Sequence, residues 1–162
     1  MTVDELLAKD EIRERLAAYC RGMDRLDDGT ALSAFHPGAA LDYGTIFQGP
    51  VEEFVSGIHE VHASMVVSAH VLGQSAITVS GDTAGSETYV VACLRTARPD
   101  GTLLDTRSTG RYVDSWALRG GAWRITERLY VHAFDDTVQV TSAGFPPDGA
   151  RDDSDPSYGV LA

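Results

Sequence analysis

The sequence predicts an α+β fold in which N-terminal helices pack on the concave face of one strongly curved sheet and close a pocket. Two observations support this prediction. Apolar residues in the first 65 positions recur at the helical period, whereas from His70 onward they alternate with a period of two. Helices followed by one long run of strands is the order typical of α+β proteins. A length of 162 residues fits a single domain, which we place at 1–140, with a tail at 141–162.

The first helix is predicted by an apolar stripe on one face and charged residues on the other. The turn sequence Leu-Asp-Asp-Gly at 26–29 indicates that this helix ends between residues 24 and 28. The stripe follows the helical period and consists of Ile12, Leu16, Tyr19, Cys20 and Met23.

Shorter elements are expected between the first helix and the sheet. A second helix is predicted at 30–35, because His36-Pro37-Gly38 would break it, and His36 is then a loop residue. A short strand is predicted at 39–47. A third helix follows Gly49-Pro50, with an apolar stripe of Val51, Phe54, Val55, Ile58, His62 and Met65.

Four extended segments make up the predicted sheet, at 68–80, 86–97, 102–117 and 122–135. Each separating sequence is typical of a hairpin turn, so we expect an antiparallel meander. Strands this long, against a usual ~5–6 residues, imply a strongly bent sheet that forms a cone. The tail contains Gly, Pro and acidic residues, so disorder is expected, although Tyr158, Val160 and Leu161 offer apolar groups for docking.

Composition excludes several classes of function. The chain has 24 Asp and Glu against 13 Lys and Arg, and the net charge of −11 argues against nucleic acid and anionic membranes as partners. No run approaches the ~20 apolar residues of a membrane span and no basic-then-apolar leader is visible, so a cytoplasmic location is expected. Cys20 and Cys93 lie far apart in the sequence and are interpreted as buried free thiols.

The same composition narrows the chemistry. Lys9 is the only lysine, which makes Schiff-base chemistry on a buried lysine improbable. The chain contains no Asn that could serve as an oxyanion donor. It also lacks the GxSxG, GxGxxG and Walker A motifs. No cofactor is therefore expected.

Asp24 and His70 are the first candidates for catalysis. Asp24 ends the apolar stripe at the C-terminal end of a helix, where an anion is unfavourable, so it is either a solvated carboxylate or one with a specific partner. His70 opens the first long strand among apolar residues. It is either a core residue or, if it faces the cone, a general base whose reference pKa suits neutral pH. An adjacent carboxylate would fix its tautomer.

The remaining candidates are more ambiguous. Alternation along the last strand places Arg128 on the face opposite Ile125, where an ion pair and a substrate contact are both open. His59 and His62 are three residues apart, which is not the zinc-protease spacing, so no metal site is predicted. His132 is a second candidate for the pocket.

The motifs IRERLAAYCRGMDRLDDG, FHPGAALDYG, SAHVLGQSAITVSGDTA and GRYVDSWALRGGAWRITER occur in this order within residues 8–135. In this order they resemble the SnoaL-like branch of the NTF2-like superfamily. That branch includes cofactor-independent dehydratases and dehydrochlorinases with an Asp–His pair. The resemblance implies that Asp24 and His70 form the pair, that Tyr19 and Arg128 complete the site, and that the protein is a homotrimer or homodimer.

Three functions follow as alternatives. The first is an acid–base lyase, dehydratase or isomerase, acting on a small hydrophobic, hydroxylated ring compound such as a polyketide, steroid or aromatic metabolite. The second is a polyketide cyclase that uses the same proton abstraction. The third is a non-catalytic small-molecule binding protein, which would be favoured if Asp24 and His70 lay outside hydrogen-bonding reach. In each case Tyr43, Phe54 and Tyr112, together with His132, are the predicted substrate-binding residues.

Overall fold

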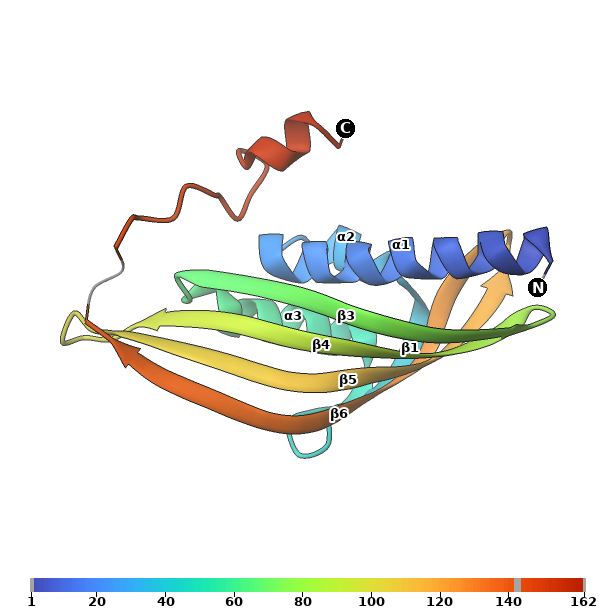
Figure 1. Ribbon diagram of the computed structural model, residues 1–162, viewed down its shortest axis with the longest axis horizontal. Coiled ribbons are helices and arrows are strands. Elements are labelled where there is room, and N and C mark those ends of the chain that lie inside the picture. The colour runs from blue at the N-terminus through green and yellow to red at the C-terminus, as the bar shows by residue number, and fades with distance from the viewer. Residues whose placement is uncertain (1, 142–143, 162) are drawn as a thin grey trace.

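The computed structural model describes residues 2–141 and 144–161, and it confirms the α+β class (Figure 1). Six strands form one sheet in the order β2-β1-β6-β5-β4-β3. The helices are α1 (Val3–Arg25), α2 (Asp28–Leu32), α3 (Val51–Ala63) and the short 3₁₀ helix η1 (Pro156–Gly159). The strands are β1 (Phe35–Asp42), β2 (Gln48–Pro50), β3 (Val67–Ser80), β4 (Thr83–Ala97), β5 (Leu103–Arg119) and β6 (Ala122–Val140).

The long strands β3 to β6 form the predicted antiparallel meander. The sheet is nevertheless mixed, because β1 pairs with β6 in parallel. Figure 1 shows the sheet bowed, with the helices on its concave side. The core lies between them and is formed by the α1 stripe together with inward-facing side chains such as Phe35, Trp116 and Ile125.

Helix α1 begins and ends with the signals that its sequence predicts. Thr2 caps its start in a capping box with Glu5. Leu26 closes its end in the left-handed conformation, with its N–H bonded to the Gly22 carbonyl. All five residues of the predicted apolar stripe are buried, so the amphipathic pattern correctly identified the face that packs on the sheet.

The region between α1 and α3 differs from the sequence prediction. Helix α2 spans Asp28–Leu32 rather than 30–35, because Asp27 caps it and its carboxylate accepts from the Thr30 amide. His36 is not a loop residue: it lies in β1, is buried, and its Nε2 is 2.9 Å from the Ala117 carbonyl oxygen. Strand β1 therefore begins at Phe35. Pro37 is tolerated because it lies in the irregular stretch between Phe35 and Ala40, where regular pairing with β6 is interrupted and pairing with β2 has not begun.

A bulge in β6 reverses the predicted orientation of Arg128. Ser115 of β5 pairs with Glu127, but the next residue, Trp116, pairs with Ile125, which leaves Thr126 as the extra residue. Ile125 and Arg128 are consequently both buried on the inner face. Simple alternation placed them on opposite faces, and that prediction is wrong.

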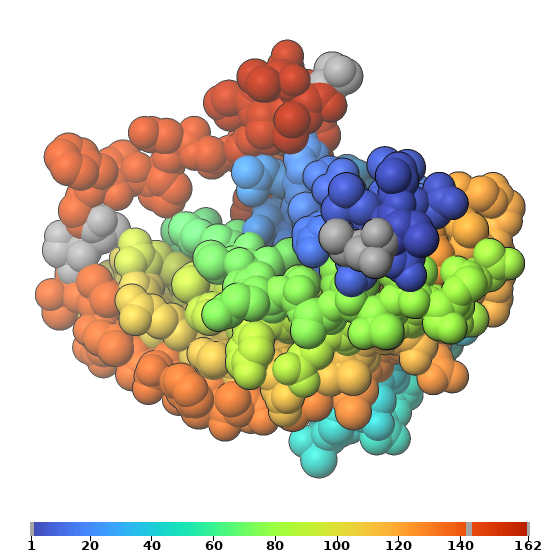
Figure 2. Space-filling view, turned by 45° about the vertical axis from the view of Figure 1, so that its right-hand side comes forward, coloured from blue at the N-terminus to red at the C-terminus, as the bar shows by residue number. Residues whose placement is uncertain are grey.

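The tail is expected to be disordered, but its later part, residues 151–158, contacts the domain. Figure 2 shows residues 144–161 arching from the end of β6 back onto α1. Arg21 contacts it twice: its Nη2 donates to Ser157 at 3.2 Å, and its guanidinium lies 4.3 Å from the centre of the Tyr158 ring. Tyr158 thus docks, whereas Val160 and Leu161 remain exposed.

Two further expectations have mixed outcomes. Cys20 is buried and free, but Cys93, also free, is partly exposed. No helix in the described part of the chain combines the length and the apolar character needed to cross a membrane.

Candidate active site

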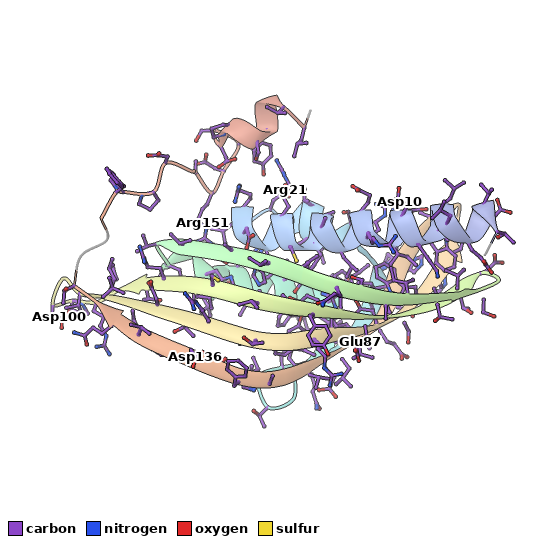
Figure 3. The ribbon with its side chains drawn as sticks, viewed as in Figure 1. Asp10, Arg21, Glu87, Asp100, Asp136 and Arg151 are labelled. Atoms are coloured by element: carbon purple, nitrogen blue, oxygen red, sulfur yellow. The ribbon has the colours of Figure 1, made fainter. Side chains whose placement is uncertain are left out.

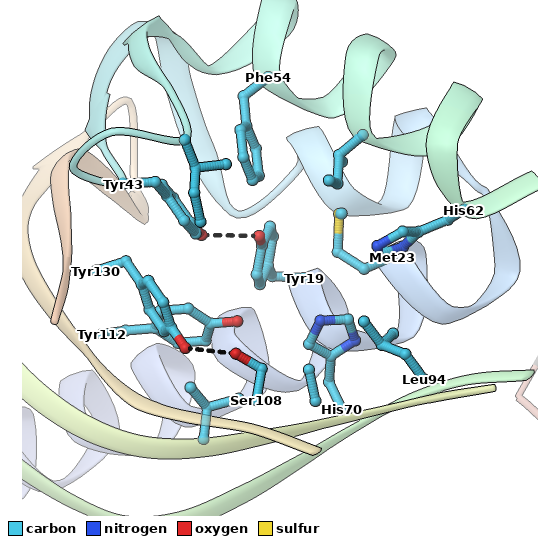
Figure 4. Close-up of a pocket in the computed structure, with 14 residues that line it drawn as sticks. Tyr19, Met23, Tyr43, Phe54, His62, His70, Leu94, Ser108, Tyr112 and Tyr130 are labelled. Carbon is cyan, nitrogen blue, oxygen red and sulfur yellow. Dashed lines mark hydrogen bonds between the residues drawn. The ribbon is translucent and has the colours of Figure 1, made fainter. Parts of the chain in front are cut away.

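A cavity lies between α1, α3 and the inner face of the sheet (Figure 4). Its volume is about 160 Å³, and its wall is mostly apolar and aromatic. Polar groups reach it from two histidines, four tyrosines and one serine. The lining residues are Tyr19, Met23, Tyr43, Ile46, Phe54, Ile58, His62, His70, Val90, Ala92, Leu94, Ser108, Tyr112 and Tyr130.

Asp24 and His70 are hydrogen-bonded to each other at this cavity. His70 Nδ1 lies 2.7 Å from Asp24 Oδ1, and the backbone amide of His70 donates to both carboxylate oxygens at 3.1 and 3.0 Å. The side chains are only 8% and 14% exposed. Because a carboxylate only accepts, Nδ1 carries the proton in this bond, and Nε2 of the neutral ring keeps its lone pair. The last turn of α1 and the first residues of β3 thus create a positioned base.

Asp24 is tolerated at the end of α1 because three residues compensate its negative charge, namely His70, Ser68 and Arg151. The His70 ring and amide donate to it, and the Ser68 hydroxyl lies 3.4 Å from Oδ1. Arg151, from the C-terminal segment, bonds the Asp24 carbonyl oxygen through Nε at 3.2 Å. These partners explain how a carboxylate persists at the negative end of a helix dipole.

Tyrosine hydroxyls form the polar part of the opposite wall. The hydroxyls of Tyr19 and Tyr43 lie 3.1 Å apart, and that of Tyr130 lies 3.3 Å from the Ser108 hydroxyl (Figure 4). Burial raises the pKa of Tyr19, Tyr43 and Tyr112 above the usual value for a phenol. These side chains are therefore neutral hydrogen-bond donors at neutral pH.

Aromatic stacking fixes the tyrosines in place. Tyr43 stacks on Phe54 at 4.3 Å between ring centres and on Tyr130 at 5.1 Å. Gly110 leaves room for the Tyr130 ring, because a Cβ on it would lie 2.6 Å from that ring. The predicted residues Tyr43, Phe54 and Tyr112 all line the cavity. Tyr130 was missed, although it follows Arg128 by two residues and so shares its face.

Arg128 supports the site from behind its wall. Its guanidinium makes a two-point ion pair with Asp114, with N···O distances of 2.7 and 2.9 Å, and both side chains are fully buried. It contacts the ring faces of Tyr112 at 3.8 Å and Tyr19 at 4.4 Å. The structure thus does not bring Arg128 to the lining or to the Asp24 carboxylate. Of the ion pair and the substrate contact that the sequence left open, it shows the ion pair, with Asp114.

His132 also lies away from the cavity. Strand alternation puts its side chain on the same face as that of Tyr130, but His132 lies further along β6, beyond the cavity wall. Its side chain is 46% exposed there, and its Nε2 lies 3.0 Å from the Asp135 carboxylate. The prediction that His132 binds substrate is therefore not supported by its position. Among residues 2–141 and 144–161, no group of three or more His, Cys, Asp or Glu side chains could hold a metal ion.

His62 is the lining residue whose role the sequence did not reveal. Its side chain comes from the last turn of α3, and its ring centre lies 6.4 Å from that of His70. Burial, together with His70, Arg151 and His59, lowers the pKa of His62 to about 4. The helical stripe placed it on the inner face, but sequence alone offered no signal that two histidines would meet there.

A curved sheet, covering helices and an apolar cavity with an Asp–His pair are features of a small-molecule pocket on an NTF2-like fold. A family model of the SnoaL-like domain matches residues 4–129, and the chain belongs to this family, within the NTF2-like superfamily. No curated protein sequence matches the chain.

Solved structures share this fold at low sequence identity. A candidate scytalone dehydratase from Novosphingobium aromaticivorans superposes with a TM-score of 0.69 at 17% identity, covering 88% of this chain and 97% of the other. The dehydrochlorinase LinA-type3 from Novosphingobium barchaimii gives 0.70 at 16% identity, covering 88% and 97%. Kfla4162 from Kribbella flavida gives 0.72 at 14% identity, covering 80% and 93%.

Proposed function

We propose that the protein is a cofactor-independent acid–base lyase that dehydrates a small, hydrophobic, hydroxylated ring compound. The observation that supports this most directly is the 2.7 Å bond between Asp24 and His70 at an apolar cavity. A base oriented in this way, in a largely apolar site, is what proton abstraction from carbon requires. The names of two structural neighbours, a dehydratase and a dehydrochlorinase, agree with elimination chemistry.

The proposed reaction is an elimination next to a carbonyl group. His70 Nε2 takes the proton from the carbon beside the carbonyl, and the C–H electron pair becomes the new carbon–carbon double bond. The C–O bond to the hydroxyl group breaks, and the oxygen leaves as water with the proton returned by the imidazolium. Asp24 stabilises that imidazolium while it exists. Positioned acid–base catalysis of this kind contributes ~10²–10⁴-fold.

The tyrosines supply hydrogen bonds to oxygen atoms of the substrate. In this proposal Tyr19 donates to the leaving hydroxyl or the developing enolate, and Tyr43 supports it through their shared hydrogen bond of 3.1 Å. Both phenols are neutral, so they stabilise developing negative charge without introducing a permanent one. Arg128, paired with Asp114, holds the rings of Tyr19 and Tyr112 in place by contacting their faces.

The size of the cavity limits the substrate. A volume of about 160 Å³ is close to that of an apolar cavity of ~150 Å³ that accepts benzene. We therefore expect a single ring to enter the cavity, with any larger part of the substrate extending through its mouth.

A panel of cyclic β-hydroxy ketones tests the proposal. We expect a conjugated double bond to appear by ultraviolet absorbance, and deuterium from D₂O to enter the position beside the carbonyl. His70→Ala lowers turnover by ~10²–10⁴-fold, whereas His132→Ala, a histidine outside the cavity, leaves it unchanged. Near-full turnover in His70→Ala would refute the proposal.

Product analysis distinguishes the related reactions. Release of water identifies the lyase, deuterium exchange with a moved double bond identifies an isomerase, and ring closure identifies a cyclase. Binding without any exchange at carbon would assign the cavity to a non-catalytic binding protein.

We also propose that the chain self-associates through the outer face of its sheet, as a homotrimer or homodimer. Val71, Tyr89, Val113 and Leu129 lie exposed on four successive strands, on the side opposite the helices. Light scattering measures the assembly, and Tyr89→Asp is expected to dissociate it. A monomeric wild type would overturn this proposal.

A further inference from the structure

The two histidines of the cavity have opposite surroundings. His70 is bonded to a carboxylate, as described above. His62 is only 5% exposed, and among the described residues neither of its ring nitrogens has a hydrogen-bond partner. Nδ1 is completely buried, whereas the ring lines the cavity. A buried N–H without a partner is rarer and costlier than a buried lone pair. The arrangement thus favours the His62 tautomer in which Nδ1 is unprotonated and Nε2 carries the proton.

Charged and titratable groups on every neighbouring element face His62. They are His70 on β3, Arg151 in the C-terminal segment, His59 on the same helix and Asp24 on α1. Burial is the largest effect on the pKa of His62, and the two histidines and the arginine lower it further, so that it reaches about 4 despite the opposing effect of Asp24. His62 is therefore a neutral imidazole at neutral pH.

Arg151 connects this histidine to the chain end. Figure 3 shows Arg151 pointing from the C-terminal segment toward the end of α1. Its Nη1 donates to the carbonyl oxygens of His62 at 2.6 Å and Met65 at 3.2 Å, while Nε donates to that of Asp24 at 3.2 Å. One guanidinium thus binds the last carbonyls of both α1 and α3. It fixes the backbone from which Asp24 and His62 project, and it adds positive charge beside both.

We propose that His62 is a second catalytic residue, a neutral imidazole whose Nε2–H donates a hydrogen bond to the substrate oxygen that becomes negative, and that Arg151 is its positioning residue. This inference rests on the proposed function. No proton leaves His62: His70 removes the proton from carbon, the electron pair moves toward the carbonyl oxygen, and His62 stabilises that oxygen by a hydrogen bond. A neutral imidazole suits this role, because an imidazolium would also repel the imidazolium that forms at His70.

Ring NMR with phenol as the probe tests the contact. Phenol is one ring with one oxygen, which matches the cavity. In ¹⁵N-labelled protein we expect phenol to shift the Nε2 resonance of His62 and to leave that of His132 unchanged. If the ring nitrogens of His70, the other cavity histidine, respond and those of His62 do not, this inference fails while the proposed cavity stands. If no cavity residue responds, both fail.

Substitutions at His62 separate hydrogen bonding from packing. His62→Phe keeps an aromatic ring without a donor, and we expect phenol to bind about 3- to 10-fold more weakly. His62→Gln retains an N–H donor and is expected to recover part of this loss. On a substrate identified with the ketone panel, His62→Phe should lower kcat more than it changes KM. Equal phenol affinity in His62→Phe and wild type would overturn the inference.

The role of Arg151 is tested without any ligand. Because its charge helps to keep His62 neutral, Arg151→Gln is expected to raise the NMR titration midpoint of His62, whereas Arg151→Lys, which keeps the charge, should retain most of the depression. Arg98→Gln, on the exposed β4–β5 turn, is the matched control. An unchanged His62 midpoint in folded Arg151→Gln would refute the positioning role, and it leaves the result for His70→Ala unaffected.

Discussion

The pKa of His62 makes a quantitative prediction about stability at acidic pH. In the unfolded chain His62 titrates near its ordinary value of about 6.5, whereas the folded protein lowers its pKa to about 4. Between these two values the unfolded state binds a proton that the folded state does not bind. Stability therefore rises with pH across this window and is lost as the pH falls through it.

The size of the effect follows from the same two values. Each pKa unit corresponds to 1.36 kcal/mol, so the folded state loses up to about 3 kcal/mol through this one side chain as the pH falls from about 6.5 to about 4. That is a large fraction of the ~5–15 kcal/mol that stabilises a typical domain.

Urea unfolding of wild type and His62→Phe, at about pH 7 and about pH 4.5, isolates this contribution. Every other titrating group is common to both proteins, so its effect cancels in the difference. We expect wild type to lose about 2–3 kcal/mol more than His62→Phe between these two pH values. Parallel pH dependence in the two proteins would show that His62 is not held neutral by its surroundings.

Two further predictions concern packing. Asp114→Ala leaves Arg128 buried without its partner and is expected to lower the free energy of unfolding, measured with urea, by about 3–5 kcal/mol. The double variant Asp114→Ala with Arg128→Met should recover much of this loss. Absence of any recovery would mean that the unpaired charge is not the cause. Gly22→Ala places a Cβ 2.3 Å from the Ala31 amide nitrogen and should lower stability by about 3 kcal/mol. Gly57→Ala, at an exposed helical position with open space, is the control and should raise the free energy of unfolding by up to about 1 kcal/mol. If both glycine variants were destabilised to a similar extent, the close approach of Gly22 to Ala31 would not be the cause.

Local periodicity was sufficient to predict most of the fold. The α1 stripe, the hairpin turns and the four long strands depend on interactions between near neighbours, which a sequence displays directly. The parallel pairing of β1 with β6 does not, because residues 43–121, about half of the chain, separate the two strands. The position of His36 was misread for a similar reason, since the Pro37-Gly38 pair indicates a break unless the irregular pairing of β1 with β6 at this point is already known.

The candidate site was predictable where a family motif marked it. Asp24 and His70 fall on such a motif, and the structure brings them into hydrogen-bonding contact. His62 and Arg151 have no such marker, because their importance arises only when α3 and the C-terminal segment pack against α1. His132 shows the reverse error. Strand alternation puts it on the same face as the cavity residue Tyr130, but alternation does not say how far along a strand a cavity extends.

The bulge at Thr126 means that chain length, as well as residue identity, encodes the site. The single extra residue acts as a phase shift in a two-residue repeat, so the inward set is offset by one after it. Deleting Thr126 would remove the bulge and place Glu127 directly after Ile125, so Arg128 and Tyr130 would still face inward by simple alternation. Deleting Leu129, by contrast, would turn Tyr130 away from the face that Arg128 occupies. The orientation of each inner residue of β6 therefore depends on where along the strand a residue is gained or lost, as well as on which residues the strand contains.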